Sequence, residues 1–449
     1  MKKMHGLFTV ALSLVLVFLP GPSSGQGTAI VAFEGVTLIP MDRERLLPKQ
    51  TVIVRDGRIA DIASADRLNV PSGAVRVDGR GKFLIPALAE MHAHIPGSDA
   101  SDQEIARVLF MYVANGIGTI RGMLGDPRHL LLRDRAARGE LISPTIYTSG
   151  PSFRGTSAPT VDVAVKMVTE QKAAGYDFLK IHPGVKRDVF DALAATADKL
   201  GIRFAGHVPV EVGLARALEA RYWTIDHLDG YVEALAREGA PVSQNFGANL
   251  ISHIDESRLP ALIAQTKAAG TWMVPTQILL ENWFGPDEPA AMAKRPEIRY
   301  ADPKQVENWT ARKKSFIDLY PIEQRTQFIG LRRRLIKALH DGGVGFLLGS
   351  DAPQVWNVPG FSMHRELGVL VASGLTPYQA LATGTRNIAV YFGTLDRSGT
   401  IEKGKQADLV LLEANPLQDI ANTSKIAGVI IGGRWLPKSE IERRLNDRS

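Results

Sequence analysis

The sequence predicts an α/β protein built on a (β/α)8 barrel of the TIM type, with a smaller β-rich domain beside it. The 449 residues are enough for a barrel of about 250 residues plus such a unit. Short β-like runs alternate with helix-like runs through the middle of the chain, and hairpin patterns gather at both ends. The composition, 45% hydrophobic and 22% charged, excludes a disordered or fibrous chain.

Eight β-like runs divide residues 86–392 into strand–helix units. The first ends at His92, and the others read IGTIRGM, TIYTSG, DFLKIH, RFAGHV, WTIDHL, TWMVPT and VGFLLGSD. Because helices separate consecutive strands, we expect a parallel sheet that closes into a barrel. The active site of such a barrel lies at the carboxyl ends of its strands.

An insertion is predicted after the seventh run, at about 282–325, because the chain there exceeds the barrel's allotment of about 31 residues per unit. We expect this segment to form a lid or wall for a hydrophobic substrate side chain, since loops at this barrel face set specificity. The alternative is an ordinary packed helical hairpin. Its aromatic residues include Trp283, Phe284, Trp309 and Tyr320.

The two ends of the chain share a hairpin pattern. Residues 29–85 contain AIVAFEGVTLIP, TVIVRDGRIADIA and AVRVDGRGKFLIP, in which apolar residues alternate and Asp-Gly pairs mark turns. Residues 393–440 resume the pattern with GTIEKGKQADLVLLEANP and IAGVIIGGRWLP. Both segments are therefore predicted to be β-rich.

The first 25 residues predict a secretory signal peptide. Lys2 and Lys3 precede an uncharged apolar run from Leu7 to Leu19, and small residues near Ser23 to Gly25 offer a cleavage site. The run is shorter than the about 20 residues that span a bilayer. We expect a secreted or periplasmic protein with no stable membrane span.

Charge and cysteine content exclude several classes of function. The net charge of +6, or +4 without the two lysines of the signal, is too small to predict nucleic-acid binding. The basic run Arg332–Arg334 lies in a helix-like pattern and is interpreted as a solvated helix face. The absence of cysteine excludes a thiolate nucleophile, an iron–sulfur cluster and a Cys-type zinc site. Any metal must be held by imidazole and oxygen ligands.

Candidate ligands fall where the predicted strands end. His92 and His94 are two residues apart, so in a strand their side chains point the same way and can converge on a metal ion. The alternative, one histidine bonded in the core and one near the surface, does not account for the spacing of the others. At about 31 residues per strand–helix unit, four more polar residues fall at the carboxyl ends of later strands. They are expected to face the same cavity as His92 and His94: Lys180, His207, His227 and Asp351.

These motifs together resemble the amidohydrolase superfamily, in particular its imidazolonepropionase-like and prolidase-like (Xaa-Pro dipeptidase-type) metal-dependent hydrolases. The similarity runs from FLIPALAEMHAH through DFLKIHPG, FAGHVP, IDHLDG and LLGSDAP to GTIEKGKQADLVLLEANPL. The resemblance implies that the two ends of the chain pair into a small β-sandwich. One departure is the segment 86–90, PALAE, where relatives usually have Pro-Gly-Leu-Ile-Asp.

The resemblance also implies a binuclear site for two divalent metal ions, with zinc the expected metal. His92, His94 and Asp351 would bind the more buried ion, and His207 with His227 the more exposed one. A hydroxide that bridges the metals would attack the substrate.

Lys180 would bridge the two ions after carboxylation by carbon dioxide, since a plain ammonium cannot bind a cation. The alternative is a buried lysine that pairs with Asp351 in a site with one metal. Asp351 would also carry the proton from the nucleophile to the leaving nitrogen.

The reaction implied is hydrolysis of the amide C–N bond of a dipeptide or N-acyl amino acid. The rivals are a cyclic amidohydrolase, a lactonase or organophosphate hydrolase, a one-metal deaminase, and an exported binding protein that has lost its chemistry. The partner is a small-molecule substrate, and the sequence leaves room for a homo-oligomer. Four residues near strand ends are candidates for substrate contact: Arg154, His182, Tyr231 and His364. The alternative is a surface role for Arg154 and Tyr231, and a hydrogen-bonded loop histidine for His182.

Overall fold

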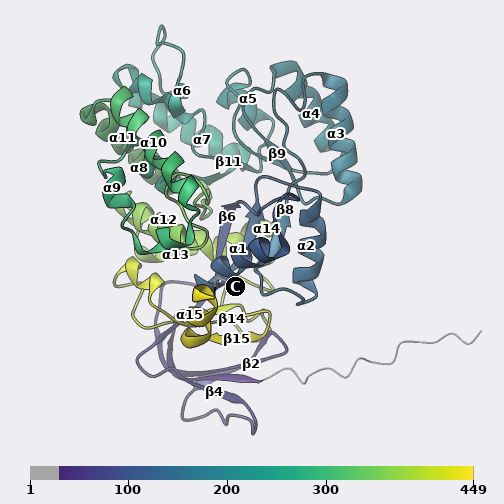
Figure 1. Ribbon diagram of the computed structural model, residues 1–449, viewed down its shortest axis with the longest axis vertical. Coiled ribbons are helices and arrows are strands. Elements are labelled where there is room, and N and C mark those ends of the chain that lie inside the picture. The colour runs from purple at the N-terminus through teal and green to yellow at the C-terminus, as the bar shows by residue number, and fades with distance from the viewer. Residues whose placement is uncertain (1–29, 448–449) are drawn as a thin grey trace, which may run out of the picture.

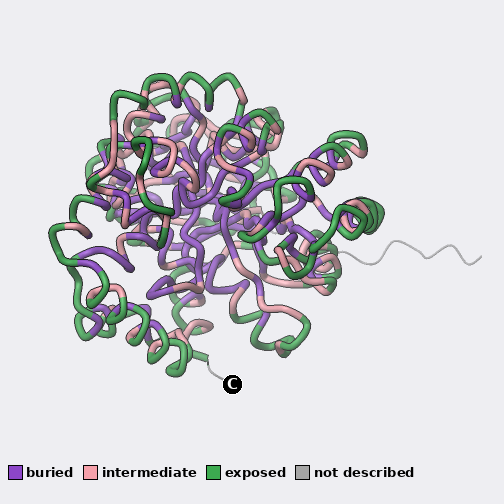
Figure 2. The backbone as a smooth tube through the Cα atoms, turned by 90° about the horizontal axis from the view of Figure 1, so that it is seen from above, coloured by how far each residue is buried: buried purple, intermediate pink, exposed green. Residues whose placement is uncertain are grey.

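The computed structural model describes residues 30–447, which form a barrel and a β domain (Figure 1). The predicted signal peptide, residues 1–25, lies outside the described residues. Buried backbone is concentrated at the centre of the barrel, and exposed backbone lies at its periphery (Figure 2). Within residues 30–447, no helix has the length and apolar character needed to cross a membrane.

The predicted barrel is present, and its strands are parallel. One run consists of β6 (Leu88–Ala93), β7 (Ile117–Gly122) and β8 (Thr145–Thr148). The next consists of β9 (Leu179–Ile181), β10 (Phe204–Gly206), β11 (Thr224–Asp226) and β12 (Trp272–Val274). A bridge between Ser149 and Phe178 joins the two runs.

The eighth predicted strand is an irregular segment, residues 345–351, that closes the ring. The backbone N–H of Leu347 donates to the carbonyl of Met273 on β12. On the other side, the N–H of Met91 on β6 donates to the carbonyl of Leu348. Every predicted β-like run of the barrel therefore has its place in the ring.

Helices follow the strands in the expected alternation. After β6 to β11 come α1 (Asp102–Ala114), α2 (Arg128–Ala137), α3 (Val161–Ala174), α4 (Arg187–Leu200), α5 (Gly213–Glu219) and α7 (Leu259–Ala269). The loop before α7 holds α6 (Tyr231–Ala234) and the 3₁₀ segments Asn245–His253 and Glu256–Arg258. After the eighth segment come α12 (Phe361–Ala372), α13 (Pro377–Gly384) and α14 (Arg386–Phe392).

Local sequence explains where these helices begin and end. The Thr160 hydroxyl accepts a hydrogen bond from the N–H of Val163 at the start of α3, and Gly175, with φ 84°, ends the helix. Helix α4 buries one apolar stripe that includes Val189, Phe190 and Leu193. That spacing is the pattern of a helix packed on a sheet.

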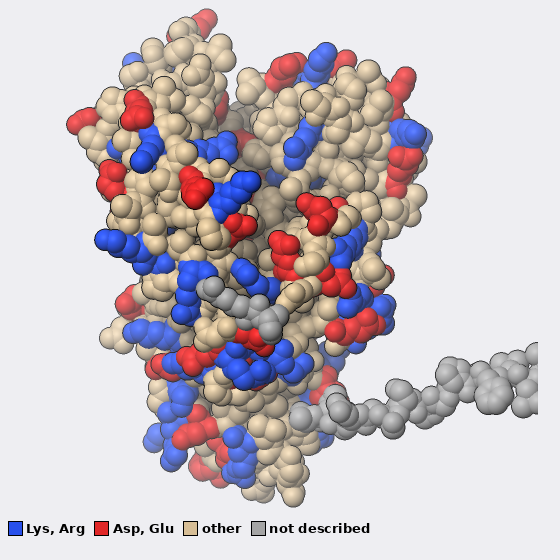
Figure 3. All heavy atoms as spheres, in the orientation of Figure 1, with Lys and Arg blue, Asp and Glu red and all other residues tan. Residues whose placement is uncertain are grey.

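The predicted insertion, about 282–325, falls within a longer helical lobe after β12. The lobe comprises α8 (Gln277–Phe284), α9 (Pro289–Met292), the 3₁₀ segment Pro296–Tyr300, α10 (Pro303–Leu319) and α11 (Ile322–Asp341). The Phe284 ring contacts the rings of Phe316, Tyr320 and Phe328. The surface is hollowed between this lobe and the lobe around α3, α4 and α5 (Figure 3).

The interpretation of Arg332–Arg334 as a solvated helix face is wrong for Arg332. This side chain is fully buried on α11, although Arg334 is exposed. Its guanidinium donates to the carbonyl of His227 at 2.8 Å and to Oε1 of Gln277 at 3.0 Å. Burial is tolerated because acceptors that follow β11 and β12 satisfy the guanidinium donors.

Both ends of the chain build one sheet of eight strands, in the order β15-β14-β13-β5-β1-β2-β3 with β4 beside β1. The ends meet where β5 pairs with β13. The strands are β1 (Val31–Leu38), β2 (Leu47–Arg55), β3 (Arg58–Ser64), β4 (Val75–Asp78), β5 (Phe83–Pro86), β13 (Leu409–Leu412), β14 (Ile426–Ile431) and β15 (Arg434–Pro437). The 3₁₀ segment Ile420–Ser424 precedes β14, and α15 (Lys438–Asn446) follows β15.

This sheet curls around a core of its own. Phe33 on β1 and Trp435 on β15 are separated by three strands in the sheet order, yet their rings lie 5.1 Å apart, edge to face. The small domain predicted from the two ends is therefore a strongly curved sheet that encloses apolar side chains.

Candidate metal centre

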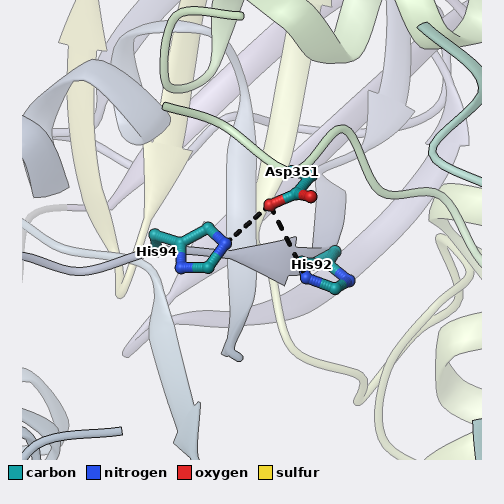
Figure 4. Close-up of side chains that lie close together, drawn as sticks. All are labelled: His92, His94 and Asp351. Atoms are coloured by element: carbon teal, nitrogen blue, oxygen red, sulfur yellow. Dashed lines mark hydrogen bonds and ion pairs between the residues drawn. The ribbon is translucent and has the colours of Figure 1, made fainter. Parts of the chain in front are cut away.

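Two histidines and a carboxylate converge at the end of β6. The ligand atoms of His92, His94 and Asp351 all lie within 4.8 Å of one another. Oδ1 of Asp351 is 2.6 Å from Nε2 of His94 and 3.6 Å from Nε2 of His92 (Figure 4). The alternation of side chains along the strand places both imidazoles on one side, as predicted.

Glycine at two positions allows the ligand-bearing backbones to approach closely. A Cβ on Gly349, which precedes Asp351 by two residues, would lie 3.0 Å from the backbone nitrogen of His92. Gly206 has φ 122°, and a Cβ there would lie 2.8 Å from Cδ of Lys180. Larger residues at these positions would push the strand ends apart.

His207 and His227 continue the row of imidazoles. They follow β10 and β11, and their ring centroids are 4.5 Å apart. The rings of His227 and His92 are 4.6 Å apart, and those of His92 and His94 are 5.5 Å apart. Four histidines from three strand ends therefore form one continuous row.

Three of these imidazoles have Nδ1 beside an oxygen of another side chain. Nδ1 of His207 donates to Oδ2 of Asp229 at 2.7 Å, and Nδ1 of His227 is hydrogen-bonded to the Thr276 hydroxyl at 2.7 Å. Nδ1 of His92 lies 2.8 Å from Oδ2 of Asp226. Outer partners of this kind fix the ring orientation of metal-ligating histidines and leave Nε2 to bind the ion.

Sequence reasoning missed these outer partners. Asp226 and Asp229 flank His227 in the IDHLD segment, which is the one local signal that could have identified them. Thr276 lies 49 residues from the histidine that it orients, so only the folded chain identifies it.

Lys180 is fully buried on β9 beside this row. A carboxylate oxygen of Asp226 lies 3.9 Å from Nζ. Nζ has no hydrogen-bond partner among residues 30–447. Burial lowers the pKa of the Lys180 ammonium, against the attraction of Asp226 and Asp351.

The donors present fit a divalent metal ion. Burial lowers the pKa of His92 and of His227, so both imidazoles are neutral and can donate a lone pair. Nε2 of His227 is buried and, like the amine of Lys180, without a hydrogen-bond partner in the described chain. Imidazole and carboxylate donors suit zinc, manganese and related ions.

Three residues of this centre have a strained backbone. His227, Thr276 and Asp351 have φ values of 62°, 42° and 63°, in the left-handed region that L-residues rarely adopt. Such conformations persist where the surrounding structure enforces them, and they cluster at active sites. The strain supports a functional role for the ends of β11, β12 and the eighth segment.

Two of the four candidate substrate contacts lie beside the histidine row. The ring of His182 is 5.2 Å from that of His207. Burial, together with the charges of Lys180, His207 and Arg154, lowers the pKa of His182. The exposed Arg154 directly follows Phe153, whose carbonyl accepts a hydrogen bond from the N–H of His182 at 2.8 Å. These two residues therefore border the candidate centre.

The other two candidates have partners elsewhere. The hydroxyl of Tyr231 is buried and hydrogen-bonded to Thr266 on α7 at 2.9 Å. His364 on α12 is hydrogen-bonded to Thr423 of the 3₁₀ segment before β14 at 3.1 Å. These contacts favour a packing role for both residues. The surface role that was the alternative for Tyr231 does not fit its burial.

A cavity of about 410 Å³ lies away from this centre, between the barrel and the β domain. Its lining includes Ala89, Gly118 and Thr145 at the beginnings of barrel strands, and Asp408 beside β13. The opposite end of the barrel, where the strands finish, is the one that carries active sites in this fold.

A protein-family model and several solved structures match this chain. The amidohydrolase family model matches residues 83–436. A solved structure assigned as a prolidase of Bifidobacterium longum is similar, with a TM-score of 0.67, 24% identity, and coverage of 93% of this chain and 98% of that one. A Xaa-Pro dipeptidase with bound methionine has a TM-score of 0.66 and 19% identity, over 91% of this chain and 100% of its own.

Among curated proteins, an adenine deaminase of Paracoccus denitrificans is 24% identical over 157 residues. That match covers 34% of this chain and 26% of the deaminase. The chain thus spans about a quarter of that relative's length.

Proposed function

Since this chain belongs to the amidohydrolase family, we propose that it hydrolyses the amide bond of a dipeptide or N-acyl amino acid. The observation that carries the proposal is the row of four imidazoles, with the Asp351 carboxylate beside three of them and Nδ1 of three rings beside an oxygen. A dipeptidase-type substrate is supported by the full-length likeness to a prolidase and a Xaa-Pro dipeptidase.

His92, His94, His207, His227 and Asp351 would hold two divalent ions, with zinc as the proposed metal. When bound, such ions polarise the scissile carbonyl and lower the pKa of water. Asp229, Thr276 and Asp226 keep the imidazoles oriented for that task.

Asp351 is proposed to move protons. Its carboxylate lies at the centre of the cluster and is only 5% exposed. It would take the proton of the attacking water and deliver it to the leaving nitrogen, so that the amide is cleaved to a carboxylate and an amine.

Lys180 is proposed to carry a carbamate. Burial favours the neutral amine, whose lone pair can attack carbon dioxide with loss of one proton. The product is an anion at a position where the described chain offers Nζ no hydrogen-bond partner. That anion would bridge the ions, whereas an unmodified ammonium would repel them.

Arg154 and His182 are proposed to receive the carboxylate of the substrate, because His182 lies beside His207 and the positively charged Arg154 follows Phe153, which is hydrogen-bonded to the backbone of His182. A planar guanidinium matches a carboxylate in geometry and charge.

The test uses the full chain with zinc and bicarbonate and a panel of dipeptides and N-acyl amino acids, with amine release measured. Asp351→Asn should lower kcat/KM by about 10²-fold or more. Asp198→Asn, at an exposed position on α4, is the matched control and should behave as the wild type. Release of ammonia from a nucleobase and no cleavage of the amide panel would instead support a deaminase.

A further inference from the structure

The loop between α6 and α7 carries three consecutive residues in the left-handed region. Asn245, Phe246 and Gly247 have φ values of 49°, 62° and 82°. Glycine adopts this conformation freely, but phenylalanine does so only under constraint. The side-chain amide of Asn245 donates to the hydroxyl of Tyr320 at 2.7 Å. The inserted lobe therefore helps to hold this loop.

The constraint places the Phe246 ring between the inserted lobe and the candidate metal centre. Its centroid is 6.2 Å from that of His227 and 5.4 Å from that of Trp283. Trp283 in turn stacks on Phe316 at 5.5 Å. Trp283 is 7% exposed, whereas Phe246 is only partly buried. The result is an aromatic shelf, Phe246 and Trp283, that begins at a proposed ligand.

The end of the histidine row at His207 has a different chemistry. The ring of His182 lies 5.2 Å from that of His207. The exposed, positively charged Arg154 directly follows Phe153, whose carbonyl accepts from the N–H of His182. The row itself is short, with 4.5 Å between the rings of His207 and His227. Polar groups thus border the imidazole of His207, and an aromatic ring borders the adjacent imidazole of His227.

We propose that the aromatic shelf binds an aromatic group of the substrate, beside the imidazole of His227. This inference deepens the proposed function and rests on it for the position of the amide. Aromatic rings pack edge to face or offset on one another with a gain beyond simple burial. The substrate class is an N-acyl amino acid or dipeptide with a free carboxylate and an aromatic group at its other end.

The test measures binding, so that it does not depend on turnover. Two product-like probes, 3-phenylpropanoate and butanoate, are titrated into the zinc-loaded full chain by calorimetry. The wild type should bind the phenyl probe at least about tenfold more tightly. Phe246→Asn removes the ring and suits the left-handed backbone, and it should reduce this preference to about threefold or less. Phe246→Tyr should retain it.

Two further variants keep the result interpretable. Trp283→Leu should reduce the preference in the same way, should Phe246→Asn fail to fold. Trp435→Phe, in the β domain, is the matched control and should leave the preference unchanged. Equal binding of both probes by the wild type would overturn the proposal. A preference that survives in a folded Phe246→Asn or Trp283→Leu protein would also overturn it.

The outcome is separable from that of the proposed function. If the phenyl preference exists and is lost in Phe246→Asn but no amide is cleaved, the shelf is supported and the hydrolase assignment fails. If amides are cleaved but the probes are bound equally, the hydrolase assignment stands and the shelf fails.

Discussion

Glu90 and Ser350 form a buried link between the first and last strands of the barrel. The Glu90 carboxylate accepts hydrogen bonds from the backbone N–H of Ser350 at 2.8 Å and from its hydroxyl at 2.6 Å. It also accepts from the N–H of His92 at 3.0 Å. One side chain thus binds the backbone beside both His92 and Asp351. Glu90 is the residue that stands where relatives of the predicted family usually have aspartate.

Removal of this link should destabilise the barrel. Glu90→Ala leaves three buried donors without an acceptor, so the free energy of unfolding should fall by about 3 kcal/mol or more, at about 1–3 kcal/mol per unsatisfied group. Ser350→Ala removes one donor and should cost about 1 kcal/mol. Urea unfolding of the metal-free proteins measures both. Equal stability of Glu90→Ala and wild type would contradict the structural role.

Asp229 should control metal affinity through His207. Asp229→Asn removes the charged acceptor 2.7 Å from Nδ1 of that ring. Loss of such an outer partner typically weakens metal binding by about 10- to 100-fold. Competition with a zinc chelator measures the affinity, and the exposed Asp198→Asn is the control. An unchanged affinity would show that His207 does not hold metal.

Lys180 should set the number of bound ions. Lys180→Arg keeps the positive charge but cannot form the proposed carbamate, so metal content should fall from about two ions per chain to one or none. Lys199→Arg, at an exposed position on α4, should keep the wild-type content. Elemental analysis after dialysis gives the number. Two ions retained by Lys180→Arg would exclude the bridging role.

Glu366 should make stability depend on pH. Burial raises the pKa of this α12 carboxyl to about 8, although it accepts from the N–H groups of Gln277 and Ile278 at the start of α8. Between pH 4.5 and about pH 8, Glu366 is protonated in the native state and ionised in the unfolded state. The stability that this proton contributes is therefore fully present below pH 4.5 and is lost as pH rises towards 8.

Glu366→Gln removes this titration. Between pH 5 and 7.5 the unfolding free energy of the wild type should fall more steeply than that of the variant, by at most about 1.4 kcal/mol per pH unit. Chemical unfolding at several pH values gives both slopes. Parallel slopes would mean that Glu366 titrates alike in the folded and unfolded chain.

The sequence predicted the strand-end residues because their positions follow from backbone periodicity. His92 and His94 share a side by strand alternation, and the strand-helix spacing places Lys180, His207 and Asp351 at the same end of the barrel. The eight β-like runs all appear in the ring, although the last, VGFLLGSD, is too irregular to form a full ladder.

Side-chain partners across the barrel could not be predicted in this way. Arg332 reads as one of three surface arginines, yet it is the one that donates to the carbonyl of His227, 105 residues away. Thr276 and Glu90 likewise acquire their roles only when distant strands come together. Tyr231 and His364 follow strand ends in sequence, but each lies on a helix. Their side chains are hydrogen-bonded to Thr266 and Thr423.

The most direct test of the central claim is a zinc titration of the metal-depleted full chain, with bicarbonate present, in which amide cleavage and bound metal are measured together. The proposed function predicts that cleavage rises with added zinc and reaches a plateau at about two ions per chain. Cleavage that is complete without metal, or a protein that binds two ions and cleaves no amide of the panel, would contradict it.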